Sequence, residues 1–177
     1  PHGTEVFEKF SPVAELAAAP AKDEGPVIPW PLSWLWSTIP FLKRHSHPMT
    51  VHYPIAFLMG ALLFCLLYLL TGNQFFEITG FYLLVLGTLT APFAVLTGLQ
   101  SWWLFYGLKR NTGLSVKLIG GPLLVSIGAT GSLLRLSNPD ILIAGGAGSF
   151  LYLALVAVCT PMVIVLGYIG GQMVFPE

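Results

Sequence analysis

Residues 43–70 read KRHSHPMTVHYPIAFLMGALLFCLLYLL, in which a basic, histidine-containing start runs into a long apolar stretch. At about 1.5 Å per residue, a helix over residues 51–70 is long enough to cross a hydrocarbon core of about 30 Å. We therefore predict that the first membrane span occupies residues 51–70.

The composition of the whole chain is that of a membrane protein. Its 177 residues are 55% hydrophobic and 9% charged, and the mean hydropathy is +0.77. Soluble domains carry roughly 25% charged residues, so this chain lacks the polar atoms to cover a soluble surface. The formal net charge of zero argues against a nucleic-acid partner, because no basic excess is available to neutralise phosphates. The expected surroundings are membrane lipid.

Three further apolar segments follow the first, at residues 78–108, 114–136 and 146–174. Short polar connectors separate them. A membrane-spanning segment must satisfy its own backbone hydrogen bonds, which helices do. The sequence therefore predicts an all-α integral membrane protein, with a bundle of four transmembrane helices over residues 43–177.

Residues 1–42 precede this bundle and fall into two parts. Residues 1–28 hold five of the eight acidic residues of the chain, and no positive region followed by an apolar one indicates a signal peptide. Residues 27–42 are rich in proline and contain Trp30, Trp34 and Trp36. Tryptophan favours the headgroup layer of a membrane. We expect this segment to be cytoplasmic and interfacial, either as an anchor lying on the membrane or as a docking surface for a neighbouring subunit.

The distribution of positive charge predicts the orientation. With four spans, both termini and the second connector share one side, which holds all the lysines and arginines except Arg135. The positive-inside rule places that side in the cytoplasm. We expect both termini to be cytoplasmic and the membrane to be an energy-transducing one, such as the bacterial inner membrane.

Small residues recur within the spans and predict close helix contacts. Gly87 and Gly98 lie in the second span, and Gly167 and Gly171 form a GxxxG pattern in the fourth. Such positions let helix backbones approach each other. Packing within the bundle is one interpretation, and contact with further subunits is the other.

Few residues have side chains that could bind a cofactor or take part in catalysis. His47 and His52 flank the start of the first span, and histidine is the commonest haem and metal ligand. A quinone needs hydrogen-bond donors at its carbonyl groups, which His52, Tyr53 and Gln100 would supply if they converged. Lys117, early in the third span, is expected to extend to the interface. We predict no catalytic residues and no metal site, because no nucleophile–base pairing or metal motif occurs.

The stretch His47-Pro48-Met49-Thr50-Val51-His52-Tyr53-Pro54-Ile55-Ala56 resembles the opening motif of a family of small predicted membrane proteins, domain of unknown function 2231. Residues 97–100 and 167–175 are also similar to that family, and the resemblance covers about residues 43–175. It implies the four-helix layout. Members occur beside or fused to redox modules, and many carry a further histidine near the position of Lys117. The acidic residue often found after the Gly-Leu pair is Gln100 here.

Two functions from different classes follow. The first is a non-catalytic accessory subunit of a larger energy-converting membrane complex, respiratory or photosynthetic, that packs against other integral membrane subunits and borders a quinone or pigment site. The second is a small membrane redox protein that binds haem b or quinone through the His47/His52 region. A stand-alone transporter is a weaker third hypothesis, since no acidic residue lies centrally in a span.

Overall fold

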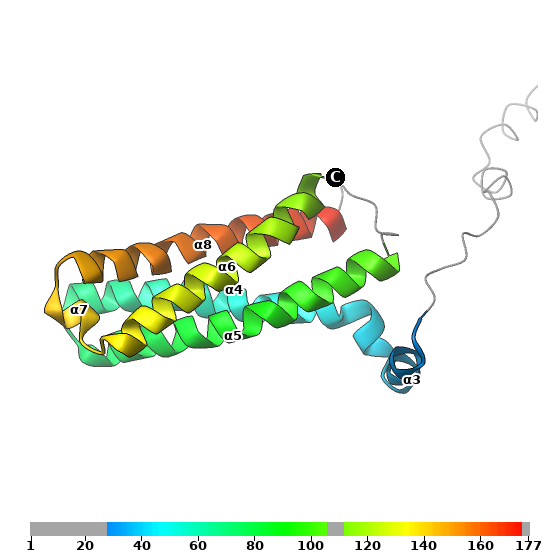
Figure 1. Cartoon of the computed structure of the whole chain (residues 1–177), viewed down its shortest axis with the longest axis horizontal. Coiled ribbons are helices and arrows are strands. Elements are labelled where there is room, and N and C mark those ends of the chain that lie inside the picture. Colours follow the sequence, from blue (N-terminus) through cyan, green and yellow to red (C-terminus); the bar gives the residue numbers. More distant parts are fainter. Residues whose placement is uncertain (1–27, 106–111, 175–177) are drawn as a thin grey trace, which may run out of the picture.

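A computed structural model of the protein describes residues 28–105 and 112–174. Four long helices form a bundle, and their bounds are α4 (Pro40–Thr71), α5 (Gln74–Phe105), α6 (Thr112–Ser137) and α8 (Ala147–Val174) (Figure 1). Each contains a segment long and apolar enough to cross a membrane, and no strand occurs within the two described ranges. The predicted all-α membrane bundle is therefore confirmed.

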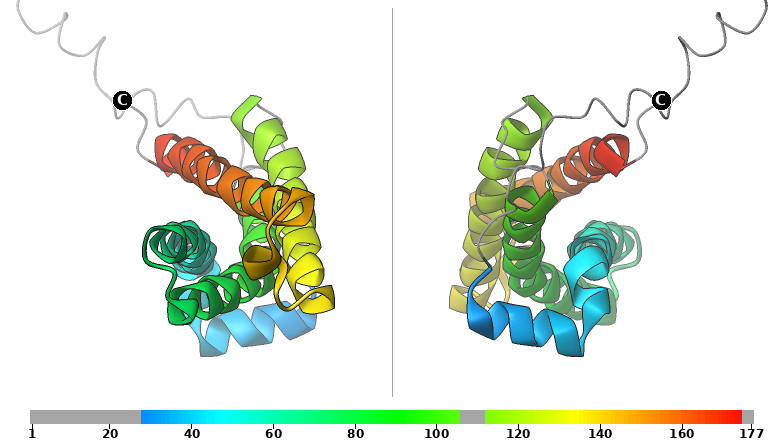
Figure 2. Two further views of the ribbon diagram at one scale, coloured as in Figure 1. Left: turned by 90° about the vertical axis from the view of Figure 1, so that its left-hand side faces the viewer. Right: turned by 90° about the vertical axis from the view of Figure 1, so that its right-hand side faces the viewer.

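The four helices are arranged as a ring. Helix α5 packs between α4 and α6, and α8 packs between α6 and α4, so that the last helix closes against the first. The end-on views in Figure 2 show this ring, with the short helix α3 (Trp30–Thr38) lying across one end of the bundle. The short helix α7 (Ile141–Ala144) lies at the opposite end and packs against α8.

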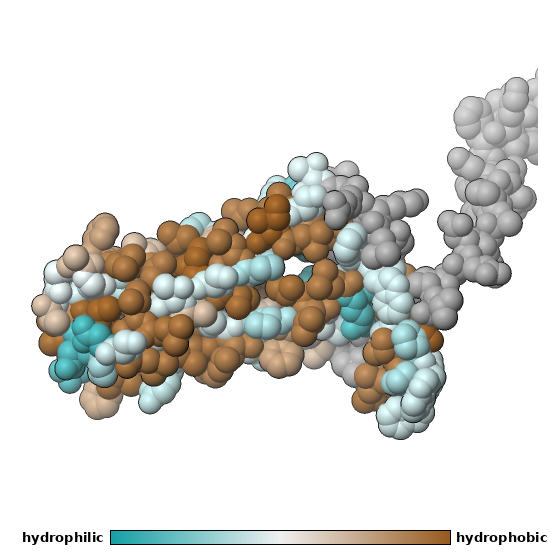
Figure 3. Space-filling model, in the orientation of Figure 1, coloured by the Kyte–Doolittle hydropathy of each residue, from teal (hydrophilic) through white to brown (hydrophobic). Residues whose placement is uncertain are grey.

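The interior of the ring is a single apolar core. All four helices contribute to it, with Leu58 and Cys65 from α4, Leu84 from α5, Leu124 from α6 and Val156 from α8. Many large apolar side chains are exposed on the outer surface, and the face drawn in Figure 3 is apolar along most of its length. In water such a surface would be an aggregation hazard, whereas in a bilayer it is the surface that meets lipid or neighbouring helices.

The first span is longer than predicted. Helix α4 runs without interruption from Pro40 through Pro48 and Pro54, whereas we expected the span to start at residue 51 and the N-terminal segment to end at residue 42. Prolines are tolerated inside membrane helices when side chains and neighbouring helices satisfy the freed backbone groups. Figure 1 shows α4 bending in its first turns toward α3, as expected for a helix with an internal proline.

The other three helices agree with the spans predicted from the sequence, apart from their ends. Helix α5 begins at Gln74 rather than at residue 78, and its predicted end at residue 108 lies outside the described residues. Helices α6 and α8 match the predicted spans 114–136 and 146–174 within two residues at each end. The start of α8 follows two glycines with positive φ, Gly145 (71°) and Gly146 (82°), which other residues rarely adopt.

Candidate functional site

Two groups of polar side chains join helices within the bundle, and the first joins α4 to α5 near the end where α4 begins. His47 is half-buried, and its Nδ1 lies 3.3 Å from Oγ1 of Thr97. Oγ1 of Thr50 lies 2.7 Å from the same Thr97 oxygen. Thr97 is thus the centre of a three-residue cluster, which we call the His47 cluster, formed by His47, Thr50 and Thr97.

The number of hydrogens on each hydroxyl limits which groups can donate and which accept in the His47 cluster. The Thr97 hydroxyl donates to the carbonyl oxygen of Phe93, at 2.9 Å, within its own helix. Its oxygen can then accept from the Thr50 hydroxyl and from the Nδ1–H of His47, since a hydroxyl has one hydrogen and two lone pairs. The carbonyl oxygen of Ala94 is a further hydrogen-bond partner of the His47 imidazole.

Gly98 lets the imidazole of His47 approach α5. A Cβ atom built on Gly98 would lie 3.1 Å from Cε1 and 3.4 Å from Nδ1 of His47. A side chain at this position would therefore push the ring away from Thr97.

Lys117, near the start of α6, lies against α8. Its Nζ lies against Gly170 of α8, where an added Cβ would be 2.9 Å away. The Lys117 side chain is half-buried, and its extension to the interface stays a prediction.

His52 and Tyr53 do not join the His47 cluster. Nδ1 of His52 lies 2.5 Å from the carbonyl oxygen of Pro48, one turn earlier in α4, and its side chain is exposed. Tyr53 is 53% exposed and its ring packs near that of Phe57, with centroids 6.3 Å apart. His47 and His52 are five residues apart on one helix, so they lie on different faces.

Gln100 is half-buried on α5, one turn beyond Thr97, and no hydrogen bond links it to another described residue. Among the described residues no hydrogen bond joins His52, Tyr53 and Gln100, the set expected to hold a quinone, so that site stays a prediction. Within the described ranges, no group of three or more His, Cys, Asp or Glu side chains is placed to hold a metal ion.

The glycines predicted to form close contacts lie mostly within the bundle. A Cβ on Gly87 would meet the side chain of Leu58 at 2.7 Å, and one on Gly167 would meet Ile55 at 3.3 Å. Together with Gly98, these glycines serve contacts between α4 and its two neighbours in the ring. Gly171, in contrast, has nothing within 4 Å of an added Cβ and faces open space.

The three tryptophans of α3 have different surroundings. Trp36 is only 6% exposed, whereas Trp30 is 80% and Trp34 is 64% exposed. The two exposed indoles line a shallow surface hollow together with Pro31 and Leu35. Trp30 and Trp34 thus form an exposed indole face on α3, which contacts α4 and lies across the end of the bundle (Figure 2).

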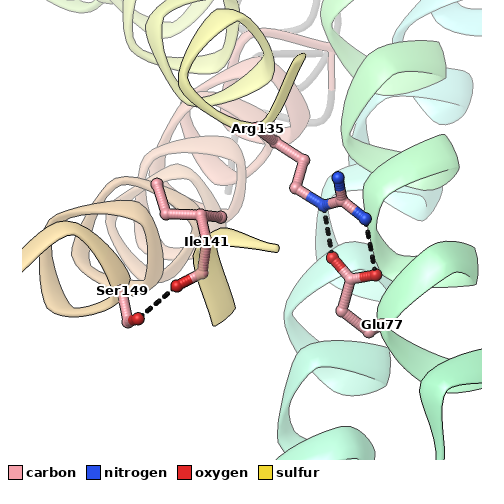
Figure 4. A network of polar contacts seen from close by, with 4 residues as sticks. All are labelled: Glu77, Arg135, Ile141 and Ser149. Atoms are coloured by element: carbon pink, nitrogen blue, oxygen red, sulfur yellow. Dashed lines mark hydrogen bonds and ion pairs between the residues drawn. The ribbon is translucent and has the colours of Figure 1, made fainter. Parts of the chain in front are cut away.

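The second polar group is an ion pair at the other end of the bundle, which sequence reasoning missed. Arg135 of α6 donates two hydrogen bonds to Glu77 of α5, from Nε at 2.5 Å and from Nη2 at 2.8 Å (Figure 4). Glu77 is 3% exposed, and the guanidinium also lies over the ring of Phe81, 5.3 Å from its centroid. Nearby, the Ser149 hydroxyl donates to the carbonyl oxygen of Ile141 and so fixes α7 to α8 (Figure 4).

A signal for this pair was present in the sequence. The start of the second span and the end of the third lie on the same side of the membrane, and each carries one charge of opposite sign. Treating Glu77 as part of a polar connector concealed this complementarity, since the residue belongs to the first turn of α5.

Comparison with known proteins agrees with this architecture. Residues 44–177 match a family model described as a predicted membrane protein, DUF2231. No curated protein and no solved structure matches the chain. The match covers the whole four-helix bundle from the first turns of α4 onward, and it includes the histidine–proline motif that carries the resemblance. The chain belongs to the family of membrane proteins called domain of unknown function 2231.

Proposed function

We propose that the protein is a non-catalytic accessory subunit of a larger energy-converting membrane complex, respiratory or photosynthetic, in which it packs beside other integral membrane subunits. The observation that carries the proposal is the indole face of α3, where Trp30 and Trp34 are 80% and 64% exposed. Tryptophan is enriched among the residues that dominate protein–protein binding energies.

The interior of the bundle supports a structural rather than a catalytic role. Most of its hydroxyl side chains donate to backbone carbonyl oxygens of their own helices, and side-chain pairs join helices at Glu77–Arg135 and in the His47 cluster. The two thiols, Cys65 and Cys159, are buried in the apolar core. Across the part of the chain that the structure describes, Thr97 is the one hydroxyl or thiol residue in hydrogen-bond contact with a histidine side chain.

The geometry favours this function over a redox protein with its own haem. A haem held by two histidines needs ligands that converge from opposite sides of the ring. His47 turns toward Thr97, and His52 bonds to its own helix. The redox context of the complex is taken from the family resemblance, because members occur beside or fused to redox modules.

The orientation is part of the proposal. Both termini lie in the cytoplasm and the membrane is an energy-transducing one, such as a bacterial inner membrane, because lysine and arginine gather on the side of the termini. Labelling of single introduced cysteines in intact cells with a membrane-impermeant reagent tests this orientation. A cysteine at residue 73, in the first connector, should react from outside, and one in residues 1–28 should not.

Native-gel separation of gently solubilised membranes, followed by mass spectrometry, tests the assembly. We expect the chain in a band with redox- or pigment-bearing subunits, and we expect Trp30→Ala with Trp34→Ala to release it. Phe75→Ala is the matched control, because Phe75 is a 77% exposed aromatic residue at the other end of the bundle. Migration as a free monomer under all conditions would contradict the proposal.

A further inference from the structure

Each membrane-spanning helix contains a proline well inside its length. These prolines are Pro54 in α4, which also contains Pro48 nearer its start, Pro92 in α5, Pro122 in α6 and Pro161 in α8. A proline has no amide hydrogen, so the carbonyl oxygen four residues earlier loses its hydrogen bond within the helix. Sharp kinks in helices occur mostly at such residues, so each span has a point at which its two halves can change their angle.

Contacts between α4, α5 and α6 place three of these prolines at one depth. Neighbouring helices in the ring run antiparallel (Figure 1). An added Cβ on Gly87 would meet Leu58 at 2.7 Å, which puts the proline of α4 level with the residue before the proline of α5. An added Cβ on Gly121 would meet Val95 at 2.8 Å, which puts the proline of α6 about two residues from that of α5. At about 1.5 Å per residue, these three prolines lie within about 5 Å of one another along the bundle.

The proline of α8 lies somewhat nearer to α7. An added Cβ on Gly120 of α6 would meet Leu166 of α8 at 2.9 Å, and one on Gly167 of α8 would meet Ile55 of α4 at 3.3 Å. By these contacts the proline of α8 is about one helical turn from the depth of that of α6 and about two turns from that of α4. We call the zone that holds the four prolines the proline level.

The apolar core lies on the α7 side of the proline level. Its buried residues in α4, α5 and α6 all lie between the proline of their own helix and the α7 end, as Leu58, Leu84 and Leu124 do. In α8, Val163 alone among these core residues lies beyond the proline, by two residues. Toward the end where α3 lies, Figure 1 shows α6 diverging from α5 and α8 diverging from α4, and Figure 3 shows the surface hollowed between α5 and α6. The two sides of the level are therefore packed differently.

Beyond the proline level the helices form two pairs. The His47 cluster joins α4 to α5, and the imidazole lies close to Gly98 of α5. In the other pair, Nζ of Lys117 of α6 lies against Gly170 of α8. We call residues 46–53 of α4 with residues 93–104 of α5 the first arm, and residues 112–121 of α6 with residues 162–172 of α8 the second arm.

We propose that the two arms are hinged at the proline level, so that they open and close against each other at the α3 end. The α7 side stays fixed, because the apolar core fills it and the Glu77–Arg135 pair joins α5 to α6 there. Opening gives lipid access to the His47 cluster from between α5 and α6. This inference does not depend on the proposed membership of a complex.

The size of the motion follows from the helix geometry. Leu99 lies seven residues beyond the proline of α5, and Val116 lies six residues beyond that of α6. A change of about 20° at each proline would move each of them by about 3 Å. Residues 106–111 connect the two arms, and the length of this connector limits the separation of Phe105 from Thr112 to about 25 Å.

Double electron–electron resonance between two nitroxide labels, on the full chain in nanodiscs, tests the hinge. Leu99→Cys with Val116→Cys labels the two arms, and Ile78→Cys with Leu136→Cys labels the same two helices at the α7 end. All four positions are exposed, whereas the native thiols are buried, and the unsubstituted chain controls for labelling of those thiols. We expect the distance distribution of the arm pair to be wider than that of the α7-end pair by about 3 Å or more.

Proline variants make the test specific. Pro92→Ala with Pro122→Ala restores the missing amide hydrogens in α5 and α6, so it should narrow the arm-pair distribution to the width found at the α7 end. Each single variant should narrow it in part, which keeps the test available if the double variant does not assemble. Pro139→Ala is the matched control, because Pro139 lies between α6 and α7, outside the spans, and it should leave the distribution unchanged.

Two results would overturn the proposal. Equal widths for the arm pair and the α7-end pair, with native prolines, would show that the arms do not move against each other. A wide arm-pair distribution that the proline variants leave unchanged would show that the arms move without these hinges.

Discussion

Glu77 and Arg135 are 58 residues apart in the chain, yet two hydrogen bonds of 2.5 and 2.8 Å join their side chains. The pair fixes the start of α5 to the end of α6. Because Glu77 is 3% exposed, removing the guanidinium would leave a carboxylate buried without a partner.

Arg135→Met should therefore lower the free energy of unfolding by about 3 kcal/mol. Cys65 and Cys159 are buried free thiols, so a thiol-reactive dye that fluoresces on labelling reports unfolding during a temperature ramp. Leu133→Ala, at a 62% exposed position of the same helix, is the control and should have little effect. Equal melting temperatures for Arg135→Met and the wild type would show that the pair contributes nothing.

Gly128→Ala should destabilise the contact between α5 and α6 by about 2 kcal/mol, because overpacking a tight contact forces neighbouring atoms to shift. A Cβ at Gly128 would collide with Oγ1 of Thr88, whereas one at Gly171 would meet nothing within 4 Å. Gly171→Ala should accordingly be neutral in the same thiol assay. Adding Thr88→Ala to Gly128→Ala should restore part of the loss, and an additive double variant would refute the clash.

Thr97→Val should change the tautomer of the His47 imidazole without unfolding the bundle. The loss of its hydroxyl removes the acceptor of the His47 Nδ1–H, at a cost of about 1 kcal/mol. Nitrogen NMR of the imidazole should show an Nδ1–H tautomer in the wild type and a mixture in the variant. The His52 signals should stay unchanged, since His52 bonds to Pro48 of its own helix. A wild-type Nε2–H tautomer would reverse the donor assignment.

Trp36→Ala should cost about 3 kcal/mol of stability, as truncation of a buried aromatic side chain does. Trp36 is 6% exposed, whereas Trp30 is 80% exposed. Trp30→Ala should therefore change the melting temperature of the isolated protein little, and the comparison needs only thermal scans in detergent. Similar losses for both variants would mean that α3 has no preferred face toward the bundle.

Much of the fold could be predicted because membrane spans are recognisable from composition alone. A helix must be long and apolar to cross the bilayer, and the spans at 114–136 and 146–174 were predicted within two residues. The start of α4 was not, because Pro48 reads as a break in a single sequence. In the structure α4 nevertheless continues through both Pro48 and Pro54, as membrane helices can.

The candidate site was harder to predict than the spans. Sequence reasoning selected His47 and Gly98 but could not show that they touch, since contacts between helices depend on rotation about each helix axis. It overlooked the pairing of Glu77 with Arg135 for the same reason. The neighbours of Thr97 in the fold, His47 and Thr50, lie about 50 residues away, where no local period reaches.

The closure of the ring by α4 and α8 has a consequence for biosynthesis. The contact of Ile55 with Gly167 joins the first spanning helix of the chain to the last. During translation, α4 and α5 can pair as soon as both have entered the bilayer, but α4 must wait for its second neighbour until the ribosome has made α8. Until then, one flank of α4 stays open to lipid or to a chaperone, and the complete bundle forms only after insertion of the final helix.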